Sequence, residues 1–219
     1  MELVLAFSDL ALIRREFLRL GLTRNDLNQD PFEQFSLWLN QAMDADLPDA
    51  TAMSLATSTS SGAPSLRTVL LKYYDQDGFV FYTNYGSRKA REIGSNPQVA
   101  LLFFWREFER QIIVQGTAEK ISTSDSLKYF LKRPRDSQIG AWVSQQSNVI
   151  TSRKLLEQKF EEIKHKFANH EIPLPSFWGG YRVSPHSIEF WQGRENRLHD
   201  RFCYLKSDEN GWKIDRLAP

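Results

Sequence analysis

Apolar residues recur every three or four positions in two segments near the N-terminus, which is the spacing of one face of a helix. The first stripe lies between a cap at Ser8 or Asp9 and a stop at Gly21, and consists of Leu10, Ile13, Phe17 and Leu20. The second begins where the cap residue Asp30 precedes the first-turn proline Pro31, and consists of Phe32, Phe35, Leu39 and Met43. We therefore predict two N-terminal helices whose apolar stripes face the core.

From Thr51 onward the pattern changes to short runs rich in β-branched and aromatic residues, separated by turn residues. Strands are predicted over 52–59, 65–74 and 79–84, and their short connections predict an antiparallel meander. A short helix over 87–93 stops before Asn96 and Pro97, and two further strands follow at 99–105 and 111–121.

The next segment returns to helical spacing. One helix is predicted from 122–124 to 132, a short one after Pro134, and a long one from about 152 with the stripe Leu155, Leu156, Phe160, Ile163 and Phe167. Strands resume from 180 to the end. Many strands joined by short turns, with helices inserted, favour a closed antiparallel barrel over a doubly wound sheet. The predicted fold class is mainly β with added helices (α+β), in one domain.

Composition narrows the choice of partners and compartment. The 219 residues carry 28 Lys and Arg against 27 Asp and Glu, so the overall charge gives no reason to expect nucleic acid or an anionic membrane. Cys203 is the single cysteine, which excludes an intramolecular disulfide and fits a reducing compartment. No apolar run is long enough to span a bilayer, and the first residues lack a cleavage site. We expect a cytoplasmic protein.

Several common motifs are absent from the sequence. It has no glycine-rich dinucleotide fingerprint, no phosphate loop and no zinc-spaced Cys/His set, and it lacks the Gly-x-Ser-x-Gly elbow of many hydrolases. We therefore predict no metal site and regard hydrolysis as a weak candidate.

The segment 190–201 concentrates aromatic and cationic side chains near the C-terminus. If it continues as a strand after Gly193, then Arg197, His199 and Arg201 project to one side, where a planar anionic ligand could use all three. The alternative is a solvated strand face with ion pairs to nearby carboxylates, namely Glu189, Glu195 or Asp200.

A second group of basic residues lies near a predicted helix start. Arg67 and Lys72 share one predicted strand, and Arg88 and Lys89 open the helix that follows Tyr82 and Thr83. A helix N-terminus offers unpaired N–H groups and a partial positive charge, so this region predicts a phosphate site.

A third group consists of Tyr129, Arg133 and Ser137, which recur every fourth residue. Because Pro134 interrupts a continuous helix, the three residues would meet between the end of one helix and the start of the next. An ordinary polar helix end is the alternative. Taken together, the two basic groups suggest a cofactor and a substrate that each carry a phosphate.

The chain resembles the pyridoxine (pyridoxamine) 5′-phosphate oxidase family from about Leu12 to Pro219. The resemblance lies in ordered motifs at 67–72, 81–84, 86–90, 133–142, 145–147, 175–180, 189–192 and 197–201. It implies an FMN-dependent oxidase of vitamin B6 metabolism that converts pyridoxamine and pyridoxine 5′-phosphate to pyridoxal 5′-phosphate, with O2 as acceptor and H2O2 as product. It also implies a split barrel and a homodimer with flavin at the subunit interface.

Carried over by position, the resemblance implies two sets of site residues. The flavin set is Arg67, Thr68, Val69, Leu70, Leu71, Lys72, Tyr82, Thr83, Arg88, Lys89, Gln111, Gln146, Ser147, Trp191 and Arg201. The substrate set is Arg14, Arg15, Glu16 and Phe17 as a lid, Lys72, Tyr129, Arg133 and Ser137 at the phosphate, and Arg197, Leu198 and His199 at the pyridine ring. Arg197 and His199 are the candidate catalytic residues, with positioning as their first role. Phe17 departs from family members that have tyrosine there.

The implied organisation is one domain, with a helical N-terminal segment at 1–48 and a barrel with inserted helices at 49–219. Two other functions remain open. A flavin reductase or flavin-binding protein of the same architecture would keep the flavin set without needing the substrate set. A nucleic-acid-binding barrel is disfavoured by the near-zero net charge.

Overall fold

The computed structural model describes residues 21–143, 146–207 and 211–219. The first predicted helix lies outside these ranges. The second is α1 (Pro31–Asp44), where the Asp30 side chain accepts a hydrogen bond from the Phe32 amide at 2.7 Å. Its predicted stripe is buried except for Met43, which is 49% exposed, because Trp38 and Ala42 complete the buried face instead.

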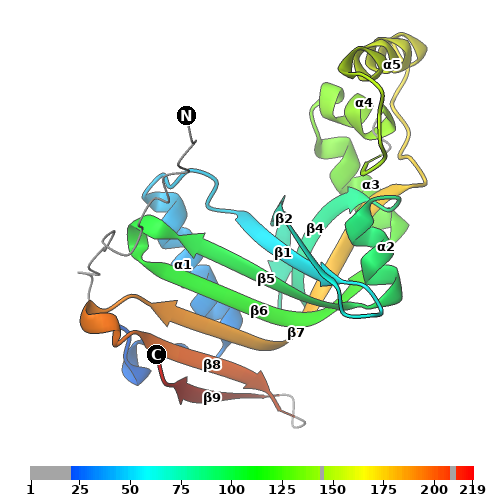
Figure 1. Cartoon of the computed structure of the whole chain (residues 1–219). Helices are drawn as coiled ribbons and strands as arrows, with labels where there is room; N and C mark the ends of the chain where they lie inside the picture. Colours follow the sequence, from blue (N-terminus) through cyan, green and yellow to red (C-terminus); the bar gives the residue numbers. More distant parts are fainter. Residues whose placement is uncertain (1–20, 144–145, 208–210) are drawn as a thin grey trace, which may run out of the picture.

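One antiparallel sheet organises the described residues (Figure 1). Its strands are β1 (Ala52–Ser58), β2 (Pro64–Leu70), β3 (Tyr73–Asp75), β4 (Gly78–Asn84), β5 (Gln98–Trp105), β6 (Arg110–Lys120), β7 (Trp178–Gln192), β8 (Asp200–Lys206) and β9 (Trp212–Leu217). The order is β2-β1-β5-β6-β7-β4-β3, with β8 pairing β7 and β9 pairing β8. Along the long strand β7, the first residues pair with β4 and the last with β8, so the sheet forks.

The predicted meander over 52–84 is wrong. The run 65–74 is two strands, β2 and β3, at opposite ends of the strand order. The chain changes partners between Leu71, whose amide donates to the Thr51 carbonyl, and Lys72, whose amide donates to the Val80 carbonyl. Residues 71 and 72 connect β2 directly to β3, so the two edge strands of the order must lie near each other. The sheet therefore curls into a half-barrel.

The barrel is split, which confirms the split barrel implied by the family resemblance and corrects the closed barrel that the strand pattern alone had favoured. β2 and β4 contact each other, but no ladder pairs β2 with β3 or β4 in the described ranges. The antiparallel, mainly β class with inserted helices is confirmed.

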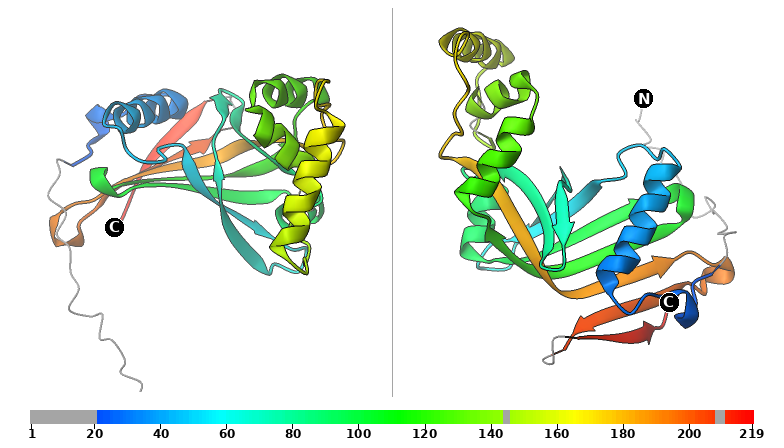
Figure 2. Two further views of the ribbon diagram at one scale, coloured as in Figure 1. Left: turned by 90° about the horizontal axis from the view of Figure 1, so that it is seen from above. Right: turned by 180° about the vertical axis from the view of Figure 1, so that it is seen from behind.

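Helices flank the sheet at two places (Figures 1 and 2). α1 lies across one face, and its rings join the main core, where Phe35 packs 4.9 Å from Phe79 and 5.1 Å from Phe103 between ring centroids. The other helices are α2 (Arg88–Ser95), α3 (Thr123–Lys132), α4 (Arg135–Val143) and α5 (Arg153–Lys166). Serine caps begin three of them, at Ser87, Ser122 and Ser152. No helix in the described ranges is long and apolar enough to cross a membrane.

The helices α3 to α5 stand beyond one end of the sheet (Figure 2). They form a second, smaller core with the start of β7, in which Phe130 and Ile139 are buried and Trp178 is 8% exposed. A cavity lies at the junction between this core and the sheet.

Candidate functional site

A cavity of about 610 Å³ opens where β2, β4 and α2 meet the α3–α4 junction. It joins both basic groups of the sequence, so the two predicted phosphate sites belong to one cavity. Its lining is Thr68, Val69, Leu70, Lys72, Tyr82, Thr83, Asn84, Lys89, Tyr129, Arg133, Pro134, Ser137, Gly140, Ala141, Gln146 and Trp178. This described lining includes three cationic side chains and no Asp or Glu.

Lys89 supplies a buried positive charge to one side of the cavity. The Ser87 cap starts α2 just before it, and the side chain is turned inward so that the residue is only 8% exposed. Its Nζ donates to Gln146 Oε1 at 2.8 Å and to Thr83 Oγ1 at 3.2 Å, both neutral acceptors. Burial, followed by the charge of Arg67, lowers the Lys89 pKa to about 8. An anion bound next to Lys89 would stabilise its ammonium group, which burial and the nearby Arg67 disfavour.

Arg133 supplies charge on another side, at the junction between α3 and α4. Its Nη1 is buried and has no hydrogen-bond partner among the described residues. The guanidinium carbon lies 4.7 Å from the centroid of the Trp178 ring, and burial lowers the Arg133 pKa. A buried donor without a partner is costly, and a ligand oxygen would satisfy it.

Three nearly parallel rings, those of Tyr82, Tyr129 and Trp178, form a stack, and Arg133 lies over the Trp178 ring. Tyr82 stacks on Tyr129 with centroids 3.9 Å apart and on Trp178 with centroids 5.4 Å apart. Tyr82 pairs across the ladder with Gly180, where an added Cβ would lie 3.0 Å from the Tyr82 ring. The missing side chain at Gly180 therefore makes room for the stack.

The prediction for Tyr129, Arg133 and Ser137 holds in its geometry. Pro134 separates α3 from α4, and the Ser137 amide donates to the Pro134 carbonyl at 2.9 Å in the first turn of α4. All three side chains line the same cavity.

Other members of the predicted flavin set, namely Arg67, Leu71, Arg88 and Ser147, are not part of the described lining. Arg67 and Arg88 both donate to Glu92, and the Arg88 amide donates to Ser147 Oγ at 3.1 Å. Leu71 is only 4% exposed and packs in the main core.

A third part of the predicted set forms a row on the sheet, away from the cavity. Gln111 on β6 pairs with Trp191 on β7, which pairs with Arg201 on β8. Paired residues of antiparallel strands point to the same face, so the three side chains lie side by side. We call them the β6–β8 row. Arg201 donates to Glu189 at 2.8 and 3.1 Å, one of the ion pairs expected for a solvated strand face.

The predicted strand after Gly193 is wrong. Gln192 pairs with Asp200, so residues 193–199 form the connection between two antiparallel strands, with a 3-10 turn at Glu195–Arg197. Asn196 and Arg197 have φ of 55° and 61°, which no strand accommodates. The alternation that was to align Arg197 and His199 with Arg201 therefore does not exist.

The connection nevertheless brings His199 close to the row. Its ring centroid lies 4.6 Å from that of Trp191, and its Nδ1 accepts a hydrogen bond from the Arg194 amide at 3.1 Å. Burial, then the charge of Arg197, lowers the His199 pKa, which favours the neutral ring. Leu198 is 68% exposed. The predicted lid residues Arg14, Arg15, Glu16 and Phe17 lie outside the described residues.

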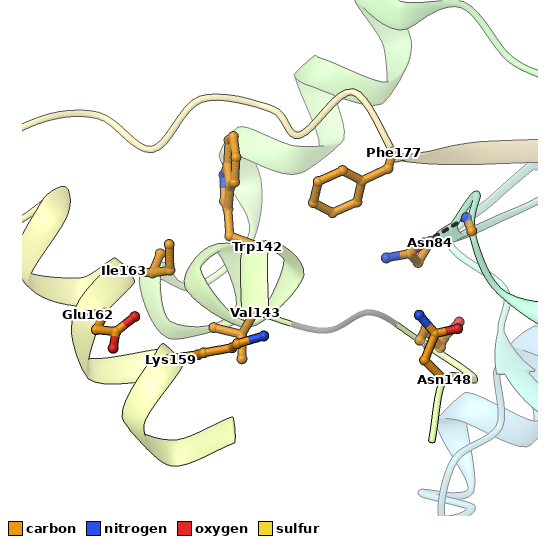
Figure 3. A pocket seen from close by; sticks show the side chains of 10 residues that line it. Asn84, Trp142, Val143, Asn148, Lys159, Glu162, Ile163 and Phe177 are labelled. Atoms are coloured by element: carbon orange, nitrogen blue, oxygen red, sulfur yellow. Dashed lines mark hydrogen bonds between the residues drawn. The ribbon is translucent and has the colours of Figure 1, made fainter. Parts of the chain in front are cut away.

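The sequence did not single out Trp178 as a site residue, although it lines the cavity and stacks under Arg133. It lies within the motif 175–180 that the chain shares with the family, but the resemblance assigned no role to it. A second cavity of about 460 Å³ also went unpredicted (Figure 3). It lies between α4, α5 and the end of β4, where Trp142 and Phe177 face Lys159 and Glu162.

Two models of known protein families match this chain, one after the other along the sequence. Residues 39–167 match the family model described as pyridoxamine 5′-phosphate oxidase. Residues 178–219 match the model described as the pyridoxine 5′-phosphate oxidase C-terminal dimerisation region. The second match contains the whole β6–β8 row except Gln111.

Similar full-length proteins are known. The pyridoxine/pyridoxamine 5′-phosphate oxidase of Rippkaea orientalis is 61% identical over 211 residues, which cover 96% of this chain and all of that protein. That of Crocosphaera subtropica is 62% identical over 213 residues, with 96% of this chain and all of that protein covered.

Two solved structures share the fold. PhzG from Burkholderia lata, in complex with tetrahydrophenazine-1-carboxylic acid, superposes with a TM-score of 0.86 at 31% identity, covering 94% of this chain and all of that one. An FMN-binding protein from Nostoc punctiforme related to pyridoxamine 5′-phosphate oxidase gives a TM-score of 0.71 at 16% identity, over 88% of this chain and all of that one. With matching models over most of its length and close relatives from end to end, this chain belongs to the pyridoxamine 5′-phosphate oxidase family.

Proposed function

We propose that the 610 Å³ cavity holds the phosphate groups of both FMN and the substrate, and that a second copy of the chain completes the site. The enzyme is an FMN-dependent oxidase of pyridoxamine 5′-phosphate and pyridoxine 5′-phosphate; it forms pyridoxal 5′-phosphate and H2O2 from O2. It works as a homodimer.

One observation carries the assignment of the cavity: Lys72, Lys89 and Arg133 converge on a described lining without a carboxylate. Cations in proteins are normally paired with acids, and three that form no ion pair with any described residue around one space favour an anionic ligand. Lys89 and Arg133 border different parts of the cavity, which suits two phosphates rather than one.

The residues present fit FMN at the Lys89 side. Among the described residues, the buried ammonium bonds only to the neutral oxygens of Gln146 and Thr83, so a phosphate would supply the missing counter-charge. We assign the FMN phosphate to Lys89, with Arg67 and Arg88 behind it. Thr68, Val69 and Leu70 line the same cavity, and we assign this end of β2 to the flavin ring.

The substrate phosphate is assigned to the other side. Arg133 offers its unpaired Nη1, and the Tyr129 and Ser137 hydroxyls line the cavity beside it. Lys72 also lines the cavity, and we leave it assignable to either phosphate. Placing the two phosphates a short way apart holds the substrate ring against the flavin, which is the orientation that hydride transfer requires.

When bound, FMN accepts a hydride equivalent from C4′ of the substrate and passes the electrons to O2. The protein contributes orientation and proton control. In the hydrogen bond from the Arg194 amide, His199 Nδ1 is the acceptor, so the neutral ring carries its proton on Nε2. In this state His199 acts as a donor toward the substrate rather than as a base. We therefore assign it, with Arg197, to holding the pyridine ring.

The position of the β6–β8 row argues for completion by a second copy. β7 contributes Trp178 to the cavity and Trp191 to the row, thirteen residues later, which is roughly 40 Å along a strand. Thr68 in the cavity and Glu189 next to the row are four strands apart in the ladder. We infer that Gln111, Trp191, Arg201, Arg197 and His199 reach the cavity of the partner subunit.

Two experiments test these assignments. The purified protein should take up FMN and release both H2O2 and pyridoxal 5′-phosphate from pyridoxamine 5′-phosphate. A protein that takes up no FMN, or takes it up without forming product, would refute the activity.

Mixed dimers test the shared site. Lys89→Met and Arg201→Ala homodimers should each have two defective sites. In an isolated heterodimer of the two variants, one site carries both defects and the other carries neither, so about half of the wild-type activity should return. If cavity and row serve one flavin within a single chain, no activity returns.

Two further assignments are proposals from the sequence pattern. We propose one domain, with a helical segment at 1–48 and a barrel at 49–219, because α1 and the sheet share one core. We also propose a cytoplasmic location, supported by the single cysteine, Cys203, which is buried as a free thiol.

A further inference from the structure

Glu92 is a buried carboxylate with an unusually complete set of donors. It lies on the inner face of α2, and the residue is 5% exposed. It accepts hydrogen bonds from the hydroxyls of Thr57 and Ser65 and from the guanidinium groups of Arg67 and Arg88. These bonds lower the Glu92 pKa to about 2 against the opposing effect of burial, so the side chain is ionised at neutral pH.

The donors come from three different elements. Thr57 is on β1, Ser65 and Arg67 are on β2, and Arg88 is in the first turn of α2. Glu92 therefore ties the helix that carries Lys89 to the hairpin that carries Arg67. A buried ion pair of this kind adds little net stability compared with an apolar side chain, because desolvation offsets the attraction. Its presence calls for a role beyond packing.

The two arginines are held differently: Arg88 keeps donors to spare, whereas both terminal nitrogens of Arg67 are fixed by partners on β1, β2 and α2. Arg88 Nε donates to Glu92 Oε1 at 2.7 Å, and its two terminal nitrogens make no hydrogen bond among the described residues. Arg67 Nη1 donates to the Leu55 carbonyl at 3.0 Å and to Thr57 Oγ1 at 2.6 Å. Its Nη2 donates to Ser65 Oγ and lies 3.4 Å from Glu92 Oε2, so Glu92 and the two hydroxyls that it accepts from fix the Arg67 guanidinium together. The Arg67 charge also lowers the Lys89 pKa, so these two cations are neighbours.

We propose that Glu92 is a positioning residue for FMN: it holds Arg67 and Arg88 in the orientation that binds the phosphate beside Lys89. The proposal rests on the assignment of the FMN phosphate to this side of the cavity. Fixing two flexible arginines before the ligand arrives removes an entropic cost from binding, and the benefit is confined to ligands that carry the phosphate.

The test compares FMN with riboflavin, which has the same ring system and no phosphate. Glu92→Gln keeps the size of the side chain and one acceptor oxygen but loses the charge that orients the arginines. We expect the Kd for FMN to rise about 10- to 100-fold, as for other residues that orient ligand-binding groups. The Kd for riboflavin should stay within about twofold of the wild-type value, and excess FMN should restore kcat with an unchanged KM for pyridoxamine 5′-phosphate.

Asp75→Asn is the matched control. Asp75 pairs with both terminal nitrogens of Arg182 and joins β3 to β7, so it is also a carboxylate that orients an arginine between elements. It has no part in the proposed flavin site, and its substitution should leave both Kd values unchanged.

Three results would overturn the proposal. The Glu92→Gln protein could bind FMN as tightly as wild type, it could bind FMN more tightly because a negative charge has gone, or it could lose FMN and riboflavin equally. If Glu92→Gln does not fold, Glu92→Asp keeps the charge on a shorter arm, and it too must weaken FMN selectively. A failure of the FMN assignment itself would appear separately, as an unchanged FMN Kd in Lys89→Met.

Discussion

Lys89 offers the most direct test of the FMN phosphate site, because its protonation should change when the ligand binds. In the free protein, burial and then the charge of Arg67 lower its pKa to about 8. A phosphate dianion against the ammonium group stabilises the charged form and raises the pKa. FMN binding should therefore take up a proton wherever the free protein has begun to lose it.

The size of the effect follows from the pKa of about 8 for Lys89 in the free protein. The proton uptake per FMN should be about 0.1 at pH 7, about 0.5 at pH 8 and about 0.9 at pH 9. Over the same range the phosphate is already a dianion, since its second pKa is about 6. If the pKa of Lys89 in the complex lies well above 9, as these uptake values assume, the apparent Kd for FMN should rise about tenfold between pH 7 and pH 9.

Isothermal titration calorimetry at pH 8 in two buffers of different ionisation enthalpy measures the uptake. The wild type should take up about half a proton per FMN, and Lys89→Met, which keeps an unbranched chain without the charge, should take up close to none. Lys128→Met serves as a control, because Lys128 pairs with Asp125 outside the cavity and its loss should leave the uptake unchanged. An uptake in Lys89→Met equal to that of the wild type would show that another group titrates and that the assignment of Lys89 is wrong.

Three other predictions concern residues that divide the site by role, and a fourth concerns the core. Arg133→Ala should raise the KM for pyridoxamine 5′-phosphate about 100-fold while FMN stays bound, since the loss of a charge-assisted phosphate contact costs about 2–3 kcal/mol; steady-state kinetics and the flavin content of the purified protein check it. Trp178→Leu removes the ring under that guanidinium and should raise the same KM about 10-fold, whereas Trp178→Phe keeps an aromatic face and should recover part of the loss. Arg197→Ala should lower kcat/KM far more than it weakens FMN retention, and an equal loss of both would contradict its placement on the substrate side. Phe35→Ala, at a fully buried ring, should lower the free energy of unfolding by about 3–5 kcal/mol in urea denaturation.

Local signals allowed the elements with their own start and stop residues to be predicted. Asp30 with Pro31 and the serine caps at Ser87 and Ser152 mark helices correctly, because a cap satisfies amides of its own first turn. The pairing of strands could not be predicted in the same way. Nothing near residues 71 and 72 reveals that one amide bonds to Thr51 and the next to Val80, since both partners are distant contacts of the folded chain.

The residues of the candidate site could be predicted from the sequence, but their arrangement in space could not. The resemblance to a family supplied the two sets of residues, and the structure brings most of the phosphate-binding members to one cavity. It also separates Gln111, Trp191 and Arg201 from that cavity within the chain, which no linear pattern shows. Trp178 was missed because a buried aromatic residue after prolines is indistinguishable in sequence from ordinary core packing.

The two strand predictions that failed fall on residues assigned to ligands, and the coincidence has a physical reason. A regular ladder fills the backbone donors and alternates side chains between two faces, so it leaves little freedom to aim a charge. Where the ladder breaks after β2, Leu71 enters the core at 4% exposure and the next residue, Lys72, borders the cavity. Where it breaks after β7, the left-handed Asn196 and Arg197 turn the chain so that His199 meets Trp191. Departures from regular structure are expected where binding sets the geometry, and these two breaks aim Lys72 and His199 at the proposed site.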